Sequence, residues 1–181
     1  HGDMGTSLVY RQPVATLISE KFANTFALMC CAWLLSGIIG FALGCIMGIW
    51  RDRWVDFILK RFCLVMCSVP TFWLGLVFLL VFSVALGWFP IGFSTPIGSA
   101  NDSVTIWQRL HHLVLPAITL SFASFANIAL HTRQKLIDVL ESDYVLFAKA
   151  RGQSTYTIIK RHGFRNIILP AVTLQFASFA E

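Results

Sequence analysis

The sequence predicts an all-α, polytopic membrane protein, and its composition, its apolar runs and the placement of its basic residues support this fold class. Of the 181 residues, 56% are hydrophobic and 13% are charged, whereas about a quarter of the residues of a soluble domain are charged. Runs without a charged residue or histidine cover 22–50, 62–88 and 113–130, and a fourth covers 167–180. Because a helix needs roughly 20 apolar residues to cross a bilayer, the first three runs suffice and the fourth is incomplete.

The runs divide the chain into spans and loops. We expect three full spans and the start of a fourth. Because the chain begins without a methionine or a signal-like leader, we expect it to be an internal part of a longer protein. The expected segments are an extracytoplasmic approach with an amphipathic helix (1–22), a span (23–50), a cytoplasmic loop (51–61), a span (62–88), an extracytoplasmic loop (89–112), a span (113–131), a cytoplasmic loop (132–165) and the start of the next span (166–181).

Lys and Arg gather in two loops and are scarce in the third. There are four in 51–61 and seven in 131–165, but only Arg109 in 89–112. Cytoplasmic loops carry an excess of these residues, which predicts that the first two loops are cytoplasmic and the third is extracytoplasmic. This topology in a lipid bilayer accounts for the net charge of +5, so no nucleic-acid partner is expected.

Two features of the first two spans concern helix packing. Small residues recur every four positions in the first span and form a stripe without large side chains: Ser36, Gly40, Gly44 and Gly48. Such a stripe lets another helix approach closely, either within a bundle, which we favour, or in a specific dimer. In the second span, Pro70 removes a backbone donor and should kink or break the helix. The break either lines a pathway or is purely structural.

Neither the cysteines nor the paired histidines predict a metal site. Cys63 and Cys67 are four apart and share a helix face, but no histidine or carboxylate accompanies them, so packing between helices is the better interpretation. His111 and His112 are adjacent and point to different helix faces. All five cysteines lie in apolar runs, where no disulfide framework is expected.

A short internal repeat relates two parts of the chain. LPAITLSFASFA at 115–126 and LPAVTLQFASFA at 169–180 differ at two positions. Since proline is favoured in the first turn of a helix, both segments are predicted to begin a span, one from each side of the membrane. The repeat is compatible with a symmetric transporter architecture, but one motif is too short to show it, and we favour shared composition at helix starts.

The second cytoplasmic loop has a helical pattern. Apolar residues recur at three- and four-residue spacing: Ile137, Leu140, Tyr144 and Phe147. They predict an amphipathic helix that ends near Gly152. Ser154 is positioned to cap a second short helix, whose apolar face is formed by Ile158 and Ile159. Two short helices with exposed apolar residues and a basic rim predict a protein docking site, whereas a basic loop lying on anionic lipid would leave the glycine and the isoleucines without a role.

This loop carries a resemblance to a known family. DYVLFAKARGQSTYTIIKRHGFRNIILPA, at 143–171, resembles the coupling loop, or EAA loop, of binding-protein-dependent ABC importer permeases of the dipeptide, oligopeptide and nickel group. GDMGTSLVYRQPV, SVPTFWLGLVFLLVFSVALGWFPIGF and HHLVLPAITL are similar to the first permease subunit of that group, in the same order. The resemblance covers essentially the whole chain. One departure is that Leu146, Phe147 and Ala148 stand where the general pattern has Glu-Ala-Ala.

The resemblance implies a type I ABC importer transmembrane fold, of which this chain would hold the second to fourth of about six helices and the beginning of the fifth. It implies a multi-pass subunit of the bacterial cytoplasmic membrane, paired with a second homologous permease subunit, two ATP-binding subunits and an extracytoplasmic solute-binding protein. The subunit itself is expected to be non-catalytic and without a cofactor, because ATP would be bound and hydrolysed by the partners. Accordingly, no GxxxxGK phosphate loop occurs in the sequence.

The implied role is to form half of a translocation path and to couple it to an ATPase subunit through 132–165. The expected coupling residues are Ala148, Gly152, Ser154, Ile158, His162 and Asn166. Ala148 and Gly152 are expected where a side chain would block close approach of the ATPase. Di- or oligopeptides are the expected solutes, with nickel or a metal chelate as the alternative. A self-contained channel or secondary carrier is the alternative of a different class, and the absence of charged residues from the spans counts against ion coupling.

Overall fold

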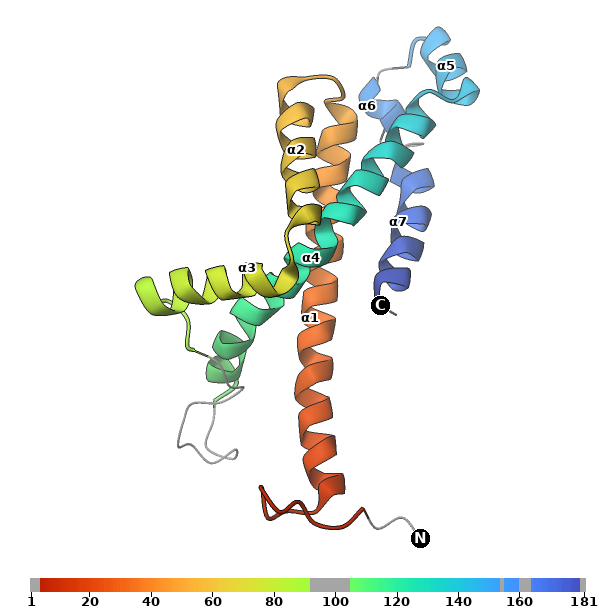
Figure 1. Cartoon of the computed structure of the whole chain (residues 1–181). Helices are drawn as coiled ribbons and strands as arrows, with labels where there is room; N and C mark the ends of the chain where they lie inside the picture. Colours follow the sequence, from red (N-terminus) through yellow and green to blue (C-terminus); the bar gives the residue numbers. More distant parts are fainter. Residues whose placement is uncertain (1–3, 92–104, 154, 160–163, 180–181) are drawn as a thin grey trace.

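The structure is a computed structural model that describes residues 4–91, 105–153, 155–159 and 164–179. In these ranges every regular element is helical (Figure 1), which confirms the all-α prediction. The elements are α1 (Val14–Ile49), α2 (Trp54–Ser68), α3 (Thr71–Phe78), the π-helix η1 (Leu79–Ala85), α4 (Ile106–Leu140), α5 (Asp143–Ala150), α6 (Thr155–Ile158) and α7 (Phe164–Phe179).

Helix α1 is a single helix of 36 residues. The prediction of a separate amphipathic helix before residue 22 is therefore wrong, because the amphipathic segment continues directly into the first span. The sequence has no proline or glycine between Val14 and Ser36 that would interrupt the backbone hydrogen bonds. The chain then turns after Ile49, and α2 begins at Trp54, within the stretch expected to be a loop.

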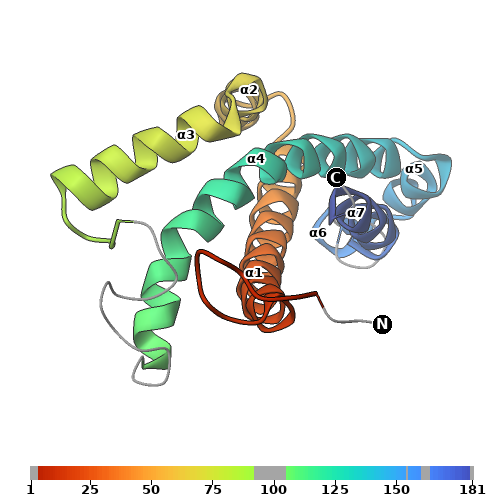
Figure 2. The ribbon, with the colours of Figure 1, turned by 60° about the horizontal axis from the view of Figure 1, so that its bottom comes forward.

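Pro70 breaks the second apolar run, as the sequence predicts. Val69, the residue before it, is extended with ψ 126°, because a proline pushes its predecessor out of the helical region. The helix resumes at Thr71, and the axes on the two sides of the break differ by 103°. As a result α3 and η1 project sideways from the other helices (Figures 1 and 2).

Helix α4 extends beyond the expected span at 113–131 in both directions. It starts at Ile106, where Thr105 and Gln108 form a capping box, and ends at Leu140. Its two halves, on either side of Ala123, are bent by 46°. The Ser121 hydroxyl, one turn before this bend, donates to the Ile118 carbonyl at 2.7 Å, an interaction that often bends helices.

The two copies of the repeat lie inside helices and do not begin them. Pro116 lies within α4 and Pro170 within α7, which corrects the prediction of two helix starts. A proline and the residues around it do not show how far the helix extends on the N-terminal side of the proline. The copies share local geometry: Thr119 donates to the Leu115 carbonyl and Thr173 to the Leu169 carbonyl, both at 2.9 Å.

Helix α4 lies at the centre of the structure and packs against α1, α2, α3 and α7 (Figure 2). The main apolar cluster brings together three helices and contains Met47, Cys63, Phe125, Ala126 and Ala129. Phe122 contacts Phe78 edge to face with ring centroids 5.4 Å apart, which holds α3 against α4. Cys63 is fully buried in the apolar cluster, in agreement with the packing interpretation of the cysteines.

Among the described residues, α1 alone is long and apolar enough to cross a membrane as one continuous helix. The number of possible spans rises to three if each bent pair of helices counts as one span. The first pair is α2 with α3 and η1, and the second is the two halves of α4. The α1–α2 turn and α5 lie at the same end of the structure, far from the N-terminal end of α1 (Figure 1). This arrangement agrees with two basic loops on one side of the membrane.

Candidate functional site

The glycine stripe of α1 lies directly against α4. A Cβ atom at Gly40 would be 2.7 Å from the Phe125 carbonyl oxygen. At Gly44 it would be 2.5 Å from the Thr132 Cβ, and at Gly48 it would be 2.7 Å from a Leu136 methyl carbon. Real Cβ atoms do not approach that closely, so glycine is needed for this separation of the two helices.

Ser36, the first member of the stripe, contacts α7. Its side chain is 1% exposed, and the Gln175 amide nitrogen donates to its hydroxyl oxygen at 3.3 Å. The same amide nitrogen donates to the Trp33 carbonyl, and the Trp33 indole nitrogen donates to the Gln175 carbonyl at 2.7 Å. Ser36, Trp33 and Gln175 therefore join α1 to α7 through polar contacts within an apolar region.

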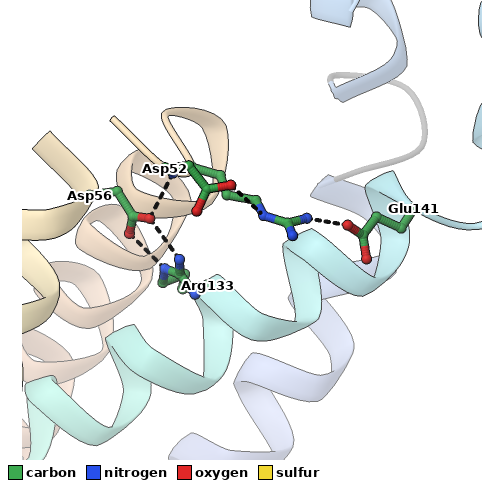
Figure 3. A network of polar contacts seen from close by, with 5 residues as sticks. Asp52, Asp56, Arg133 and Glu141 are labelled. Carbon is green, nitrogen blue, oxygen red and sulfur yellow. Dashed lines mark hydrogen bonds and ion pairs between the residues drawn. The ribbon is translucent and has the colours of Figure 1, made fainter. Parts of the chain in front are cut away.

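A buried ion pair joins α2 to α4. Arg133 donates from Nε to Asp56 Oδ1 and from Nη2 to Asp56 Oδ2, both at 2.6 Å (Figure 3). Asp56 is 3% exposed, and its Oδ2 also accepts from the Asp52 backbone nitrogen at 3.0 Å. Two parallel charge-assisted hydrogen bonds fix both distance and orientation, which a single contact cannot do.

A second, exposed ion pair lies beside the buried one. Arg51, in the α1–α2 turn, contacts the Glu141 carboxylate just after the end of α4, and its Nε lies 3.2 Å from Asp52 (Figure 3). The hydrogen bond that Arg51 donates to the Glu141 carboxylate raises the pKa of Arg51 above its ordinary value, so this guanidinium stays charged. The α1–α2 turn and the start of α2 are thus bonded at two points to the C-terminal part of α4 and the residue after it.

The segment after α4 forms a compact unit of two short helices, which we call the α5–α6 unit (Asp143–Ala150 and Thr155–Ile158). Helix α5 ends in a Schellman motif: Gly152 donates to the Lys149 carbonyl at 2.9 Å and Gln153 to the Ala148 carbonyl at 3.2 Å. Gly152 has φ +80°, a conformation that only glycine adopts without cost. The motif reverses the chain, and Ile158 then packs against Val145 and Ala148.

The α5–α6 unit corrects the predicted amphipathic helix. Ile137 and Leu140 belong to α4, whereas Tyr144 and Phe147 belong to α5, because the chain breaks at Glu141 and Ser142. Ser142 is the extended N-cap residue of α5. The spacing of the apolar residues predicts one helix, because it continues unchanged across Glu141 and Ser142. These two polar residues separate α4 from α5.

Two of the expected coupling residues are buried inside the unit. Ile158 is 0% exposed and Ala148 is 8% exposed, and both pack α6 on α5. Within the described chain these two residues therefore have a packing role, and their contact with an ATPase subunit stays a prediction. A Cβ at Gly152 would meet nothing within 4 Å of the described chain. Glycine is therefore favoured at this position by its positive φ angle, and not by a lack of space.

Three large apolar side chains of α5 are exposed: Tyr144, at 45%, Leu146, at 52%, and Phe147, at 65%. The Arg151 guanidinium lies 5.8 Å from the Phe147 ring centroid. Asn166 is exposed, and its amide nitrogen donates to the Tyr144 hydroxyl at 2.8 Å, which links α7 to α5. The predicted residues Ser154 and His162 lie outside the described residues.

Asp56 and Arg133 are candidate functional residues that the sequence analysis did not single out. Both lie in basic segments, where charge was attributed to topology. An available signal was the acidic character of Asp56, since the 51–61 loop is otherwise basic apart from Asp52. Its partner, 77 positions away, has no such signal.

Comparison with known proteins places this arrangement in a family. Residues 40–181 match the family described as "Binding-protein-dependent transport system inner membrane component". The chain belongs to this family. It is 35% identical over 174 residues to the oligopeptide transport system permease protein AppB of Bacillus subtilis, which covers 96% of this chain and 54% of that protein. It is 38% identical over 178 residues to the glutathione transport system permease protein GsiC of Escherichia coli, covering 98% of this chain and 54% of that protein.

Membership of this permease family confirms the resemblance inferred from the sequence and the assignment to a membrane. The chain spans about half the length of the curated relatives it matches. The match includes α4, the α5–α6 unit and α7, together with the part of α1 that carries Gly40, Gly44 and Gly48.

Proposed function

We propose that this chain belongs to a transmembrane permease subunit of an ATP-driven importer of di- or oligopeptides. The observation that carries the proposal is the family match over residues 40–181, together with a two-helix unit that follows α4, the helix that packs against α1, α2, α3 and α7. In this role the subunit forms half of a translocation path in the bacterial cytoplasmic membrane. It pairs with a second, homologous permease subunit.

The α5–α6 unit is the part that receives mechanical work in this proposal. Two ATP-binding subunits hydrolyse ATP, and their closure moves the unit through contacts with Leu146 and Phe147, the two most exposed apolar residues of α5. Helix α4 then changes its tilt relative to the bundle, which shifts the equilibrium between inward-facing and outward-facing states. The subunit has no catalytic residue and no cofactor of its own in this scheme.

An extracytoplasmic binding protein delivers the solute on the other side of the membrane. The names of the relatives support peptides as the solute class, since one is named for oligopeptides and the other for glutathione, a short peptide. Neither name refers to a metal, so the nickel alternative has no support of this kind. The paired His111 and His112 do not alter this choice, because His111 contacts the Trp88 carbonyl at 2.9 Å within the chain.

The test is uptake by the complete transporter in proteoliposomes. The full-length subunit is reconstituted with its second permease subunit, both ATPase subunits and the binding protein, and labelled dipeptide and nickel are supplied in separate assays. We expect dipeptide uptake that requires ATP and the binding protein, with none from the permease subunit alone. Uptake of nickel in place of dipeptide would contradict the solute class. Uptake by the single subunit without ATP would contradict the importer and favour a channel or secondary carrier.

A further inference from the structure

We propose that Asp56 and Arg133 are positioning residues that make the α1–α2 turn move together with the end of α4, so that motion of the α5–α6 unit reaches α1 and α2. This inference rests on the proposed function. The inference adds a route by which motion of the α5–α6 unit reaches α1 and α2, and the family match does not supply this route.

The charges of Asp56 and Arg133 are costly to bury. Only 4% of the Asp56 side chain and 12% of the Arg133 side chain are exposed. Removing two charges from water is costly, and a buried ion pair is often no more stable than an apolar pair of the same size. Stability alone is therefore a poor reason for placing Asp56 and Arg133 here, whereas a fixed orientation between two helices is a role to which a bidentate pair is suited.

The buried and the exposed ion pair lie at the same end of α4. Arg133 lies near the C-terminal end of α4, and Glu141 is the residue directly after that end, followed by Ser142, the N-cap residue of α5. Arg133 bonds to Asp56 in the first turn of α2, and Glu141 bonds to Arg51 in the α1–α2 turn just before it (Figure 3). The two bonds, one within α4 and one just after it, together restrict rotation of the end of α4 relative to the turn and the start of α2.

The turn itself has an unusual backbone conformation. Asp52 has φ +61°, in the left-handed region that residues other than glycine rarely adopt. Its backbone nitrogen donates to Asp56 Oδ2, and its carboxylate lies 3.2 Å from Arg51. The Asp56 carboxylate therefore supports this backbone conformation through a hydrogen bond, and loss of Asp56 would remove that bond together with the ion pair to Arg133.

The rest of the α2–α4 contact consists of apolar packing and one hydrogen bond farther along α2, from the Cys67 thiol to the Asn127 side-chain oxygen at 3.3 Å. Leu59, Met66 and the buried Cys63 pack on the Phe125 cluster. Apolar contacts are not directional, so these side chains fix the orientation of the two helices less tightly than a bidentate ion pair does. The ion pair is thus the directional link between the two helices among the described contacts at this end.

The experiment compares coupling in the complete, full-length transporter in proteoliposomes. ATP hydrolysis is measured with and without the binding protein loaded with dipeptide, and peptide uptake is measured in parallel. The variants are Asp56→Asn, Arg133→Gln and the double variant. We expect each single variant to lose about fivefold or more of the solute-dependent stimulation, with basal hydrolysis and the yield of assembled complex unchanged. The double variant should be no worse than either single variant, because all three remove the same link.

Lys135→Gln is the matched control, since Lys135 is on the same helix and pairs only with Asp138, at 3.8 Å and in exposed positions, among the ion pairs the structure describes. It should leave the stimulation unchanged. Wild-type stimulation in Asp56→Asn and Arg133→Gln, an equal loss in Lys135→Gln, or additive losses in the double variant would each overturn the inference.

If transporters with substitutions at Asp56 or Arg133 do not assemble, variants of the exposed pair Arg51–Glu141 test the inference. Arg51→Gln and Glu141→Gln change side chains that are 42% and 60% exposed and should not affect folding. Reduced stimulation in both would support the link between turn and helix, and wild-type stimulation in both would overturn it. A wild-type transporter without any solute-dependent hydrolysis would instead overturn the proposed function, which separates the two failures.

Discussion

At the scale of single residues, glycine is required in this chain for two different reasons. Gly44 is required for space, because a Cβ there would lie 2.6 Å from the Ala129 carbonyl oxygen, a backbone atom that cannot move aside alone. Gly152 is required for conformation, because its φ is +80° and the space around it is open in the described chain. The two reasons lead to different predictions for substitution.

Gly44→Ala should separate α1 from α4. The added methyl group collides with Ala129 and Thr132, so we expect a loss of about 1–3 kcal/mol of stability, as for other overpacked cores. The measurement is thermal unfolding of the purified full-length subunit in detergent. Gly75→Ala is the matched control, since its nearest contact would be the Thr119 methyl group at 3.3 Å. An equal loss of stability in the two variants would contradict the close approach at Gly44.

Gly152 substitutions should depend on tolerance of the left-handed conformation. Valine at this position costs roughly 1–2 kcal/mol or more and should open the turn between α5 and α6, whereas asparagine adopts this conformation more readily and should preserve it. Hydrogen exchange of the α5 and α6 amides reports the difference directly. Faster exchange in Gly152→Val, with Gly152→Asn close to wild type and normal membrane insertion of both, is the expected result. Equal exchange in the two variants would show that φ is not the reason for the glycine.

At the scale of elements, local signals in the sequence predict local structure. The break at Pro70 and the glycine stripe were both predictable, because each depends on the geometry of one helix and its immediate neighbour. The boundary between α4 and α5 was not, because the apolar period continues through Ser142 and only the N-cap conformation of that residue ends the helix. The buried Ile158 illustrates the same limit, since its spacing shows an apolar face but not which surface covers it.

The contact between α1 and α7 is a second element that the sequence did not reveal. Gln175 is one of two positions at which the repeats differ, and it is buried against Trp33 and Ser36. The polar contact with α1 is therefore made at a position where the two copies of the repeat differ, and not by the residues that they share. The corresponding Ser121 is also buried but donates to a carbonyl of its own helix.

Gln175→Leu should weaken the packing of α7 against α1. The variant loses donors to Trp33 and Ser36, and interhelical hydrogen bonds in membranes contribute about 0.6 kcal/mol on average, with a maximum near 1.7. Thermal unfolding of the purified subunit is the measurement. Thr173→Val is the control on the same helix, because the Thr173 hydroxyl donates to the Leu169 carbonyl of α7 itself. Unfolding midpoints that fall equally in both variants would contradict a specific link to α1.

At the scale of the whole molecule, the account depends on the path from the α5–α6 unit to the bundle. Helix α4 is continuous from beside α3 to the start of α5 and packs against α1 along much of its length, so movement at one end is transmitted by a helix and not by a flexible loop. The ion pairs at its C-terminal end join the α1–α2 turn to the same movement. The chain therefore has the mechanical continuity that ATP-driven transport requires of a permease subunit.

The central claim is that the exposed face of α5 contacts an ATPase subunit, and site-specific photo-cross-linking in the assembled transporter tests it most directly. A photoreactive residue replaces Phe147 in one variant and Phe57 in the control. Both are exposed phenylalanines with an arginine over the ring, Arg151 and Arg61 respectively. We expect the residue at 147 to cross-link the ATPase subunit in high yield and the residue at 57 not to do so. Cross-linking of the ATPase from 57 but not from 147, or from neither, would contradict the account.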